Sequence, residues 1–372
     1  MKVGILTMNR VINYGSFLQA YALQQMIRQA GGETEFLDIG PAARRYDNMY
    51  RENPQYWINI CKARLHGLLG HRQVSRTMLS EQAHWKFYHT LNNRFPQWWE
   101  RWLGMARVDN LRTSYDKIVV GSDEVFNCTQ RSDWGASMKW FGEGLDTRTL
   151  ISYAASFGFT TQERLRAAGL EEKVSGCLKN FRALSVRDEN SKKILEGMGA
   201  AAENHLDPVL VYDYERMVKP QRSLQDTIII YTYPDRLQEQ DVIEAVQALA
   251  QREKLRIVSI GSFYPWCENL ILTPFEVLQH FYNAKYVVTD TFHGTVFSLR
   301  FQRPFATLVR DSNRQKLEDL LDRMGQQEAA IAKGSELDRV LHRQIPREQI
   351  REKLRLEQAR TMDYLKRNLC DD

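Results

Sequence analysis

The sequence has few cysteines and no long apolar run, and each absence narrows the class of protein. The five cysteines, at positions 61, 128, 177, 267 and 370, form no C-x-x-C pair, and no histidine stands at metal-ligand spacing from them. This pattern predicts reduced, mostly structural thiols and argues against a zinc site. No apolar segment is long enough to span a bilayer. Residues 1–7 have the pattern of a first strand rather than of a signal peptide, so we expect a cytoplasmic protein.

The sequence also lacks the glycine-rich motifs that hold nucleotides. Neither a G-x-G-x-x-G segment nor a P-loop is present, so neither a dinucleotide nor ATP is indicated. No nucleic-acid motif, internal repeat or low-complexity segment is found. The formal net charge of +5 suits an anionic substrate or surface without requiring a nucleic acid. We expect neither a metal ion nor another cofactor.

The sequence does contain an α/β pattern long enough for two domains. Its 372 residues exceed one ordinary core, and its 43% hydrophobic and 26% charged residues are typical of a globular protein. We expect a Rossmann-like domain over residues 1–212, with a basic helical insertion near 54–110, and a second such domain over 225–345. Residues 346–372 form a charged helix that we expect to pack back on the first domain.

Short β-branched runs alternate with helical periodicity through both halves. We expect strands at residues 2–7, 35–39, 115–120, 150–155, 183–188, 205–210, 227–233, 256–260, 286–288 and 305–309. We expect helices at residues 17–30, 165–177, 191–197, 239–251, 274–283, 315–324 and 346–369, and one that follows residues 291–294.

One strand-to-helix turn in the second half carries a candidate acid. The strand at residues 286–288 ends in Thr289 and Asp290, and residues 291–294 can cap the next helix, which places His293 at the turn. Ligands of open α/β sheets bind at this crevice, and a helix N-terminus there favours an anion. A titratable imidazole in this place suits an acid catalyst. The alternative is a histidine that only caps the helix.

Polar residues also end several strands of the first half. Ser122, Asp123, Ser156 and Arg187 each stand at or just after a predicted strand end, so we expect them to line one cleft. The planar fork of an arginine matches a carboxylate or a phosphate. Pairing of Arg187 with the acidic residues that follow it is the alternative.

The loop at residues 13–16 follows the first strand and precedes a helix. Its members Asn13, Tyr14, Gly15 and Ser16 can hold a carboxylate or phosphate through backbone N–H groups, or can simply form a tight turn. Both interpretations stay open.

The segment at residues 56–108 is basic and rich in tryptophan. It can rest on an anionic membrane surface, hold a long saccharide, or be a helical insertion whose aromatic side chains belong to the core.

Six segments together resemble the polysaccharide pyruvyl transferase family. They are N-Y-G-S-F-L-Q-A-Y-A-L (13–23), V-V-G-S-D-E-V-F-N (119–127), S-Y-A-A-S-F-G (152–158), L-S-V-R-D (184–188), L-D-P-V-L (206–210) and V-T-D-T-F-H-G-T-V-F-S-L-R-F-Q-R-P-F (288–305). Their shared order along the chain is more specific than any single motif. The family usually reads G-S-D-Q-V-W-N and T-D-S-F-H-G, so Glu124, Phe126 and Thr291 depart from it, whereas Asp123 and His293 are kept.

The resemblance implies a GT-B-like fold, with two Rossmann-like domains of mostly parallel strands facing across a cleft. It implies transfer of a pyruvyl group from phosphoenolpyruvate to hydroxyls of a sugar, as a ketal, in a cell-surface polysaccharide or its lipid-linked precursor. His293 is then the acid, and the other catalytic candidates are Arg187, Asp290 and Asp123. The substrate-binding candidates are Asn13, Tyr14, Gly15, Ser16, Ser122, Ser156, Gly294, Thr295, Arg310 and Arg314.

Two other functions remain as alternatives. A nucleotide-sugar glycosyltransferase would share the fold, but no acidic ribose-binding signal is seen in the second half. A non-catalytic saccharide-binding relative is the other, and the presence of both His293 and Arg187 argues against it. A lipid-linked acceptor would bring the enzyme to the inner face of a membrane as a peripheral protein.

Overall fold

Two parallel sheets form the centre of the molecule. The computed structural model describes residues 1–38, 76–105, 110, 113–130 and 137–370. The strands of the first half are β1 (Lys2–Leu6), β2 (Glu33–Phe36), β3 (Tyr115–Val120), β4 (Thr147–Ser152), β5 (Phe181–Ala183), β6 (Ser185–Val186) and β7 (Glu203–Asn204). Those of the second half are β8 (Thr227–Tyr231), β9 (Arg256–Ile260), β10 (Glu268–Leu270), β11 (Tyr286–Thr289), β12 (Phe305–Leu308) and β13 (Ala330–Ile331).

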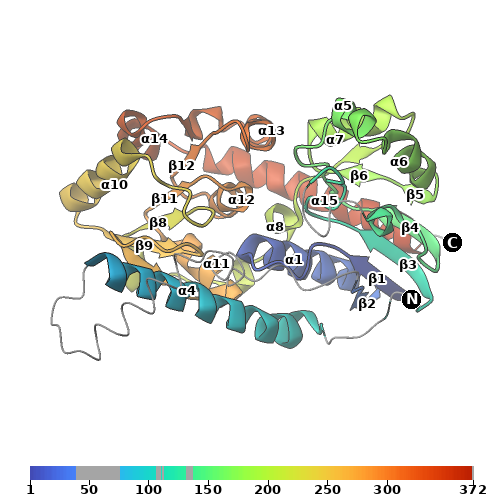
Figure 1. Ribbon diagram of the computed structural model, residues 1–372, viewed down its shortest axis with the longest axis horizontal. Coiled ribbons are helices and arrows are strands. Elements are labelled where there is room, and N and C mark those ends of the chain that lie inside the picture. Colours follow the sequence, from blue (N-terminus) through green and yellow to red (C-terminus); the bar gives the residue numbers. More distant parts are fainter. Residues whose placement is uncertain (39–75, 106–109, 111–112, 131–136, 371–372) are drawn as a thin grey trace.

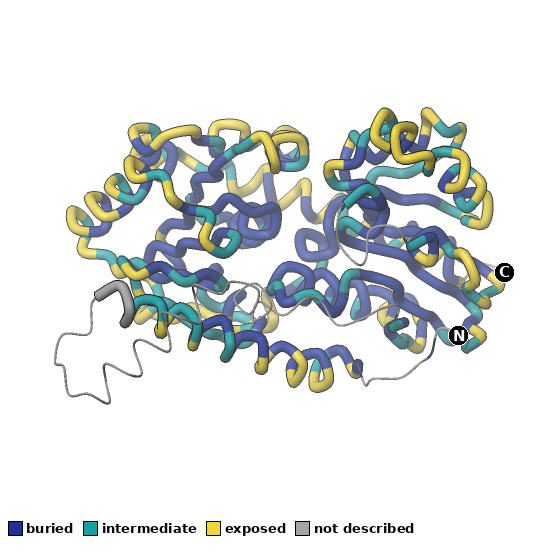
Figure 2. The backbone as a smooth tube through the Cα atoms, viewed as in Figure 1, coloured by how far each residue is buried: buried dark blue, intermediate teal, exposed yellow. Residues whose placement is uncertain are grey.

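The strand order is that of two open α/β sheets. The first sheet has the order β2-β1-β3-β4-β5 and the second β10-β9-β8-β11-β12-β13, while β6 and β7 form a separate pair. All neighbouring strands are parallel, as in the pairing of Ile5 with Val119 and of Val288 with Ile230. β8 and β11 are buried at every position, since helices cover both faces of a parallel sheet. Figure 2 shows these strands as the buried interior of each half.

Helices connect and cover the strands (Figure 1). In the first half these are α1 (Tyr14–Gln29), α4 (Arg76–Trp98), the π-helix η1 (Trp99–Leu103), η2 (Met138–Phe141), α5 (Gln162–Ala167), α6 (Glu171–Leu178), α7 (Glu189–Gly197) and α8 (Pro208–Val211). The remainder are η3 (Glu215–Met217), α9 (Arg222–Gln225), α10 (Gln240–Glu253), α11 (Pro274–Asn283), α12 (Phe292–Arg300), α13 (Arg314–Met324), η4 (Gln327–Ala329), η5 (Gly334–Glu336), α14 (Leu337–Leu341) and α15 (Arg347–Cys370).

The C-terminal helix α15 packs back on the first half, as predicted. Its Tyr364 hydroxyl donates a hydrogen bond to the carbonyl oxygen of Ser152 over 2.8 Å. The hydroxyls of Thr361 and Tyr153 lie 3.1 Å apart. These contacts tie α15 to the end of β4, and Figure 1 shows the helix running from one half to the other.

The aromatic side chains in the described part of the basic segment belong largely to the core. Trp98, Trp99 and Phe95 are buried, and the rings of Phe95 and Trp98 pack on Tyr14 of α1 with centroids 5.3 and 6.0 Å away. Residues 54–75 of the expected insertion lie outside the described residues. No helix in the described ranges has both the length and the apolar character needed to cross a membrane.

Three of the predicted elements were wrong. The strand expected at residues 183–188 is divided, because β5 ends at Ala183, β6 belongs to a separate two-stranded sheet, and Asp188 caps α7. Residues 205–210 were expected to form a strand, but α8 begins at Pro208 because the Asp207 side chain accepts a hydrogen bond from the Val209 N–H and proline suits a first helical position. The helix expected at residues 165–177 is divided into α5 and α6. Gly169 lies between them with a φ of 66°, a left-handed conformation that ends the first helix. We keep the domain boundaries at residues 212, 225 and 346 as a proposal.

Candidate functional site

His293 lies at the beginning of α12, directly after β11. The Thr291 side chain accepts a hydrogen bond from the Gly294 N–H over 2.9 Å and so caps the helix. His293 is the second residue of α12 and is only 8% exposed. The predicted position of His293 at a strand-to-helix turn is therefore confirmed, and Thr291 rather than His293 is the cap.

The first turn of α1 contacts the imidazole from the other half of the molecule. A Cβ added at Gly15 would lie 2.1 Å from Cγ of His293, so only glycine leaves room for the ring. The Asn13 side chain caps α1 by accepting hydrogen bonds from the N–H groups of Gly15 and Ser16. Two helix N-termini thus meet at His293, and both bring a positive dipole end toward it.

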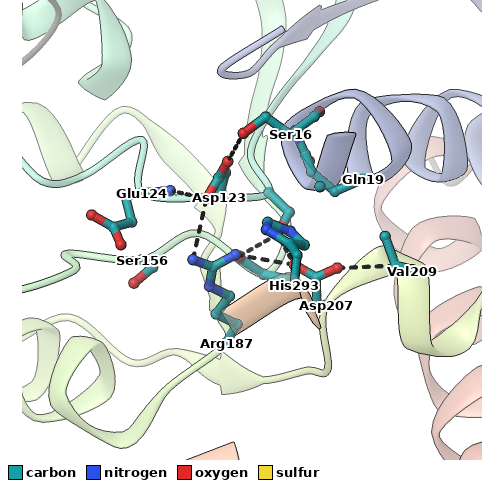
Figure 3. Close-up of polar contacts among 12 residues, drawn as sticks. Ser16, Gln19, Asp123, Glu124, Ser156, Arg187, Asp207, Val209 and His293 are labelled. Atoms are coloured by element: carbon teal, nitrogen blue, oxygen red, sulfur yellow. Dashed lines mark hydrogen bonds and ion pairs between the residues drawn. The ribbon is translucent and has the colours of Figure 1, made fainter. Parts of the chain in front are cut away.

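Arg187 joins two buried carboxylates beneath His293 (Figure 3). Its Nη1 lies 3.0 Å from Oδ2 of Asp207, and its Nη2 lies 3.2 Å from Oδ1 of Asp123. The Ser16 hydroxyl donates a hydrogen bond to the other oxygen of Asp123 over 2.8 Å. The guanidinium also lies 4.3 Å from the ring centroid of Phe292, which precedes His293. This arrangement links residues of both halves through one cation.

Asp207 is the carboxylate nearest to the imidazole. Its Oδ2 lies 3.6 Å from Nε2 of His293, a separation too long for a hydrogen bond. Burial alone would raise the pKa of Asp207, but His293, the Arg187 charge and the Val209 N–H outweigh it, so this pKa is lowered. Asp207 is therefore an anion beside the imidazole. Nε2 is buried and has no hydrogen-bond partner in the described part of the chain.

The backbone around Asp123 is strained. Asp123 has a φ of 77°, a left-handed conformation that costs a non-glycine residue about 1–2 kcal/mol. Its side chain is held from two sides by Ser16 and Arg187. Strained backbone conformations that neighbouring side chains stabilise are common at functional sites.

Comparison with known proteins agrees with the sequence resemblance. A family model described as polysaccharide pyruvyl transferase matches residues 13–312. The chain belongs to this family. The matched range includes Gly15, Asp123, Arg187, Asp207 and His293. No curated protein sequence matches the chain.

The likeness to one solved structure indicates a GT-B fold for this member of the pyruvyl transferase family. The UDP-GlcNAc 2-epimerase from Neisseria meningitidis bound to UDP-GlcNAc has a TM-score of 0.51 at 10% identity, covering 100% of both chains. An O-GlcNAc transferase mutant from Thermobaculum terrenum has a TM-score of 0.41 at 14% identity, covering 100% of this chain and 66% of that one. At these identities the likeness concerns the fold alone.

Other predicted site residues of this family member lie in a second polar cluster. The Asp290 side chain accepts a hydrogen bond from the Tyr233 N–H over 3.1 Å, and its Oδ2 lies 3.2 Å from Nε of Arg236 and 3.6 Å from Nε of Arg310. Arg310 also pairs with Glu239. Burial raises the pKa of Asp290 despite the Tyr233 N–H and the two arginines. Asp290 is thus engaged at the ends of β8 and β11, without a contact to His293.

Five further candidates make contacts that support the site or lie outside it. Thr295 bonds to the Thr291 carbonyl and to Thr307, and Gly294 packs on Thr289. Ser156 donates to the Asp188 cap of α7, and the Tyr14 hydroxyl donates to the Leu272 carbonyl. Arg314 is exposed at the start of α13, where it pairs with Asp311 and Glu318.

Ser122 and the ion pair of Glu124 with Lys316 complete the junction. The Ser122 hydroxyl lies 2.9 Å from the Ala154 carbonyl oxygen and 3.4 Å from Oδ2 of Asp207. Lys316 Nζ lies 2.9 Å from Oε1 of Glu124 and joins α13 to the first half. Burial opposes ionisation of Glu124, but Lys316 outweighs it and lowers the pKa to about 2.

Sequence analysis missed both Asp207 and Lys316. Asp207 had a recognisable signal, because aspartate followed by proline is typical of a helix start rather than of a strand. Lys316 had none, since a lysine on an amphipathic helix is ordinarily a solvated residue.

Proposed function

We propose that the protein transfers a pyruvyl group from phosphoenolpyruvate to two hydroxyls of a saccharide and releases phosphate. The observation that carries this proposal is the position of His293, at the meeting point of two helix N-termini and beside the anionic Asp207. Helix N-termini favour a bound anion. Membership of the pyruvyl transferase family supports the same chemistry.

His293 is suited to donate a proton to the methylene carbon of phosphoenolpyruvate. That proton converts the methylene to a methyl group and leaves cationic character at C2, where the first sugar hydroxyl forms a C–O bond. The second hydroxyl then bonds to C2 as the C–O bond to phosphate breaks. Of the two hydroxyl protons, one restores the imidazolium and the other leaves with phosphate. Asp207, whose carboxylate lies 3.6 Å from the imidazole, acts as a positioning residue.

Donor binding calls for groups that accept a carboxylate and a phosphate. The N-termini of α1 and α12 offer N–H groups, and Arg187 uses two of its five N–H donors on Asp207 and Asp123. Arg310 and Lys316 are further cations of the second half, each held by a glutamate. We assign the donor to the helix N-termini that meet at His293.

The test is phosphoenolpyruvate-dependent phosphate release in the presence of nitrophenyl or lipid-linked sugars. We expect the acceptor to gain the mass of pyruvate less one water, and we expect His293→Ala to lower the rate by about two to four orders of magnitude. His280→Ala is a matched control, because His280 lies on α11 and its imidazole bonds to the carbonyl of Glu276 over 2.8 Å.

Three results would contradict the proposal. The first is a mass gain of one hexose on the acceptor that depends on a nucleotide-sugar. The second is saccharide binding without turnover, and the third is full activity of His293→Ala at an unchanged thermal midpoint. The first would indicate a glycosyltransferase, and the second a saccharide-binding protein.

A further inference from the structure

A polar cavity lies between the residues that follow α13 and the start of α15. Its volume is about 710 Å³, and its lining includes Gln326, Glu328, Arg343, Gln344, Arg347 and Glu348. α12 has nine residues with His293 at its second position, so the helix spans about 13 Å. Arg303 follows its other end, where burial and the charge of Arg347 lower the Arg303 pKa. The cavity is therefore separate from the candidate active site.

Two arginines, Arg343 and Arg347, line this cavity. Nη1 of Arg343 donates hydrogen bonds to the carbonyl oxygens of Phe305 and Val340, each over 2.7 Å. Among the residues with described positions, no carboxylate oxygen lies within 4.0 Å of a side-chain nitrogen of Arg303, Arg343 or Arg347. Nε of Arg303 is buried and has no hydrogen-bond partner there. Burial lowers the pKa of Arg343 to about 10, although the charge of Glu328 opposes this shift.

The balance of charge around the cavity is positive. Arg343 and Arg347 line the cavity, and the charges of Glu328 and Arg339 both act on Arg343, in opposite directions. Of the two lining carboxylates, Glu348 already pairs with Arg351 over 2.6 Å. The first turn of α15 adds the N–H groups of residues 348 and 349, which have no partner within the helix, and the positive end of its dipole. An anion placed here would gain contacts that the protein itself leaves unmade.

We infer that this cavity binds a phosphate-bearing ligand, held by Arg343, Arg347 and the first turn of α15. Guanidinium groups and helix N-termini both match phosphate oxygens. The side chains of Gln326 and Gln344 border the same space and can bond to hydroxyls. Free phosphate and a sugar phosphate share this chemistry. They differ in the hydroxyls of the sugar, which can bond to the two glutamines.

Binding to the full chain is measured by calorimetry with inorganic phosphate and with glucose 1-phosphate. Hydrogen exchange locates the binding, and we expect slower exchange at residues 343–350 when either probe is present. Arg347→Gln should weaken binding by about tenfold or more, since a hydrogen bond between charged groups is worth that much. Arg222→Gln is the control, because Arg222 is also an exposed arginine at the first position of a helix.

The outcomes separate this site from the proposed active site. His293→Ala should leave the protection at residues 343–350 unchanged, whatever its effect on turnover. Tighter binding of glucose 1-phosphate than of phosphate assigns the site to sugar phosphates, and equal binding assigns it to free phosphate. The inference is overturned if neither probe protects residues 343–350, or if Arg347→Gln and Arg222→Gln bind equally well at equal thermal midpoints.

Discussion

Replacing Gly15 by alanine tests whether the start of α1 sets the position of His293. The added Cβ would lie 2.1 Å from Cγ, 2.3 Å from Nδ1 and 2.4 Å from Cβ of the histidine. Carbon atoms in contact prefer separations of about 3.5–4.0 Å, so the imidazole must move by about 1 Å or more. A displacement of that size at a reacting group can cost about 100-fold in rate. We therefore expect kcat/KM to fall by about two orders of magnitude.

The effect on stability should be smaller than the effect on activity. Overpacking costs about 1–3 kcal/mol, and alanine regains about 1 kcal/mol over glycine as a helix former. The fold should therefore survive. Gly176→Ala in α6 is the matched control, because no atom lies within 4 Å of a Cβ added there.

Phosphoenolpyruvate-dependent phosphate release is measured for both variants beside their thermal midpoints. The imidazole resonances of His293 provide a readout that needs no acceptor, and they should shift only in Gly15→Ala. Full activity and unchanged resonances in Gly15→Ala would refute the tight contact between the two helix N-termini. Equal losses in both variants would indicate a general effect of helix substitution.

Three further predictions concern charged groups. Arg187→Lys should raise the KM for phosphoenolpyruvate and lower the thermal midpoint, because an ammonium lacks the planar fork that reaches both carboxylate partners; unchanged values in steady-state kinetics and thermal unfolding would contradict this. Burial, with nearby arginines, lowers the pKa of His205 from 6.5 to about 3, so its contribution to stability is present above about pH 6.5 and is lost as pH falls. The free energy of unfolding, measured with urea, should fall by about 2 kcal/mol between pH 7.5 and pH 5 because of this group. His205→Gln should remove that part of the pH dependence. Finally, a double-mutant cycle of Glu124→Gln and Lys316→Gln should give a coupling of about 1–3 kcal/mol, whereas additive effects would show that their contact contributes nothing.

Local pattern was enough to predict most of the fold. The strands at residues 115–120 and 256–260 and the helix at 274–283 begin and end where the sequence predicts. The two strands read as buried runs, and the helix carries a Thr273 and Glu276 capping box with proline at its first position. The prediction was wrong at residues 205–210 because hydrophobicity alone does not separate a short buried strand from a short buried helix.

The candidate site was predictable only as a set of strand ends. The sequence places His293, Asp123 and Arg187 at such ends, and the structure brings their side chains together. Asp290 stands at an equally suitable position, yet its carboxylate turns toward the Tyr233 N–H and Arg236. The path of the loop after a strand decides which strand-end residue faces the cleft. No residue pattern encodes that path.

The relative placement of the two halves explains why distances within the site could not be predicted. His293 approaches Asp207, Phe292 covers Arg187, and Lys316 pairs with Glu124 across the same junction. Position 124 is also one where the family usually has glutamine, and a lone glutamate buried there would be costly. Lys316, in the other half, supplies the opposite charge. The glutamate at position 124 is therefore explained only by contacts between the two halves. The orientation of His293 depends on contacts between the halves in the same way.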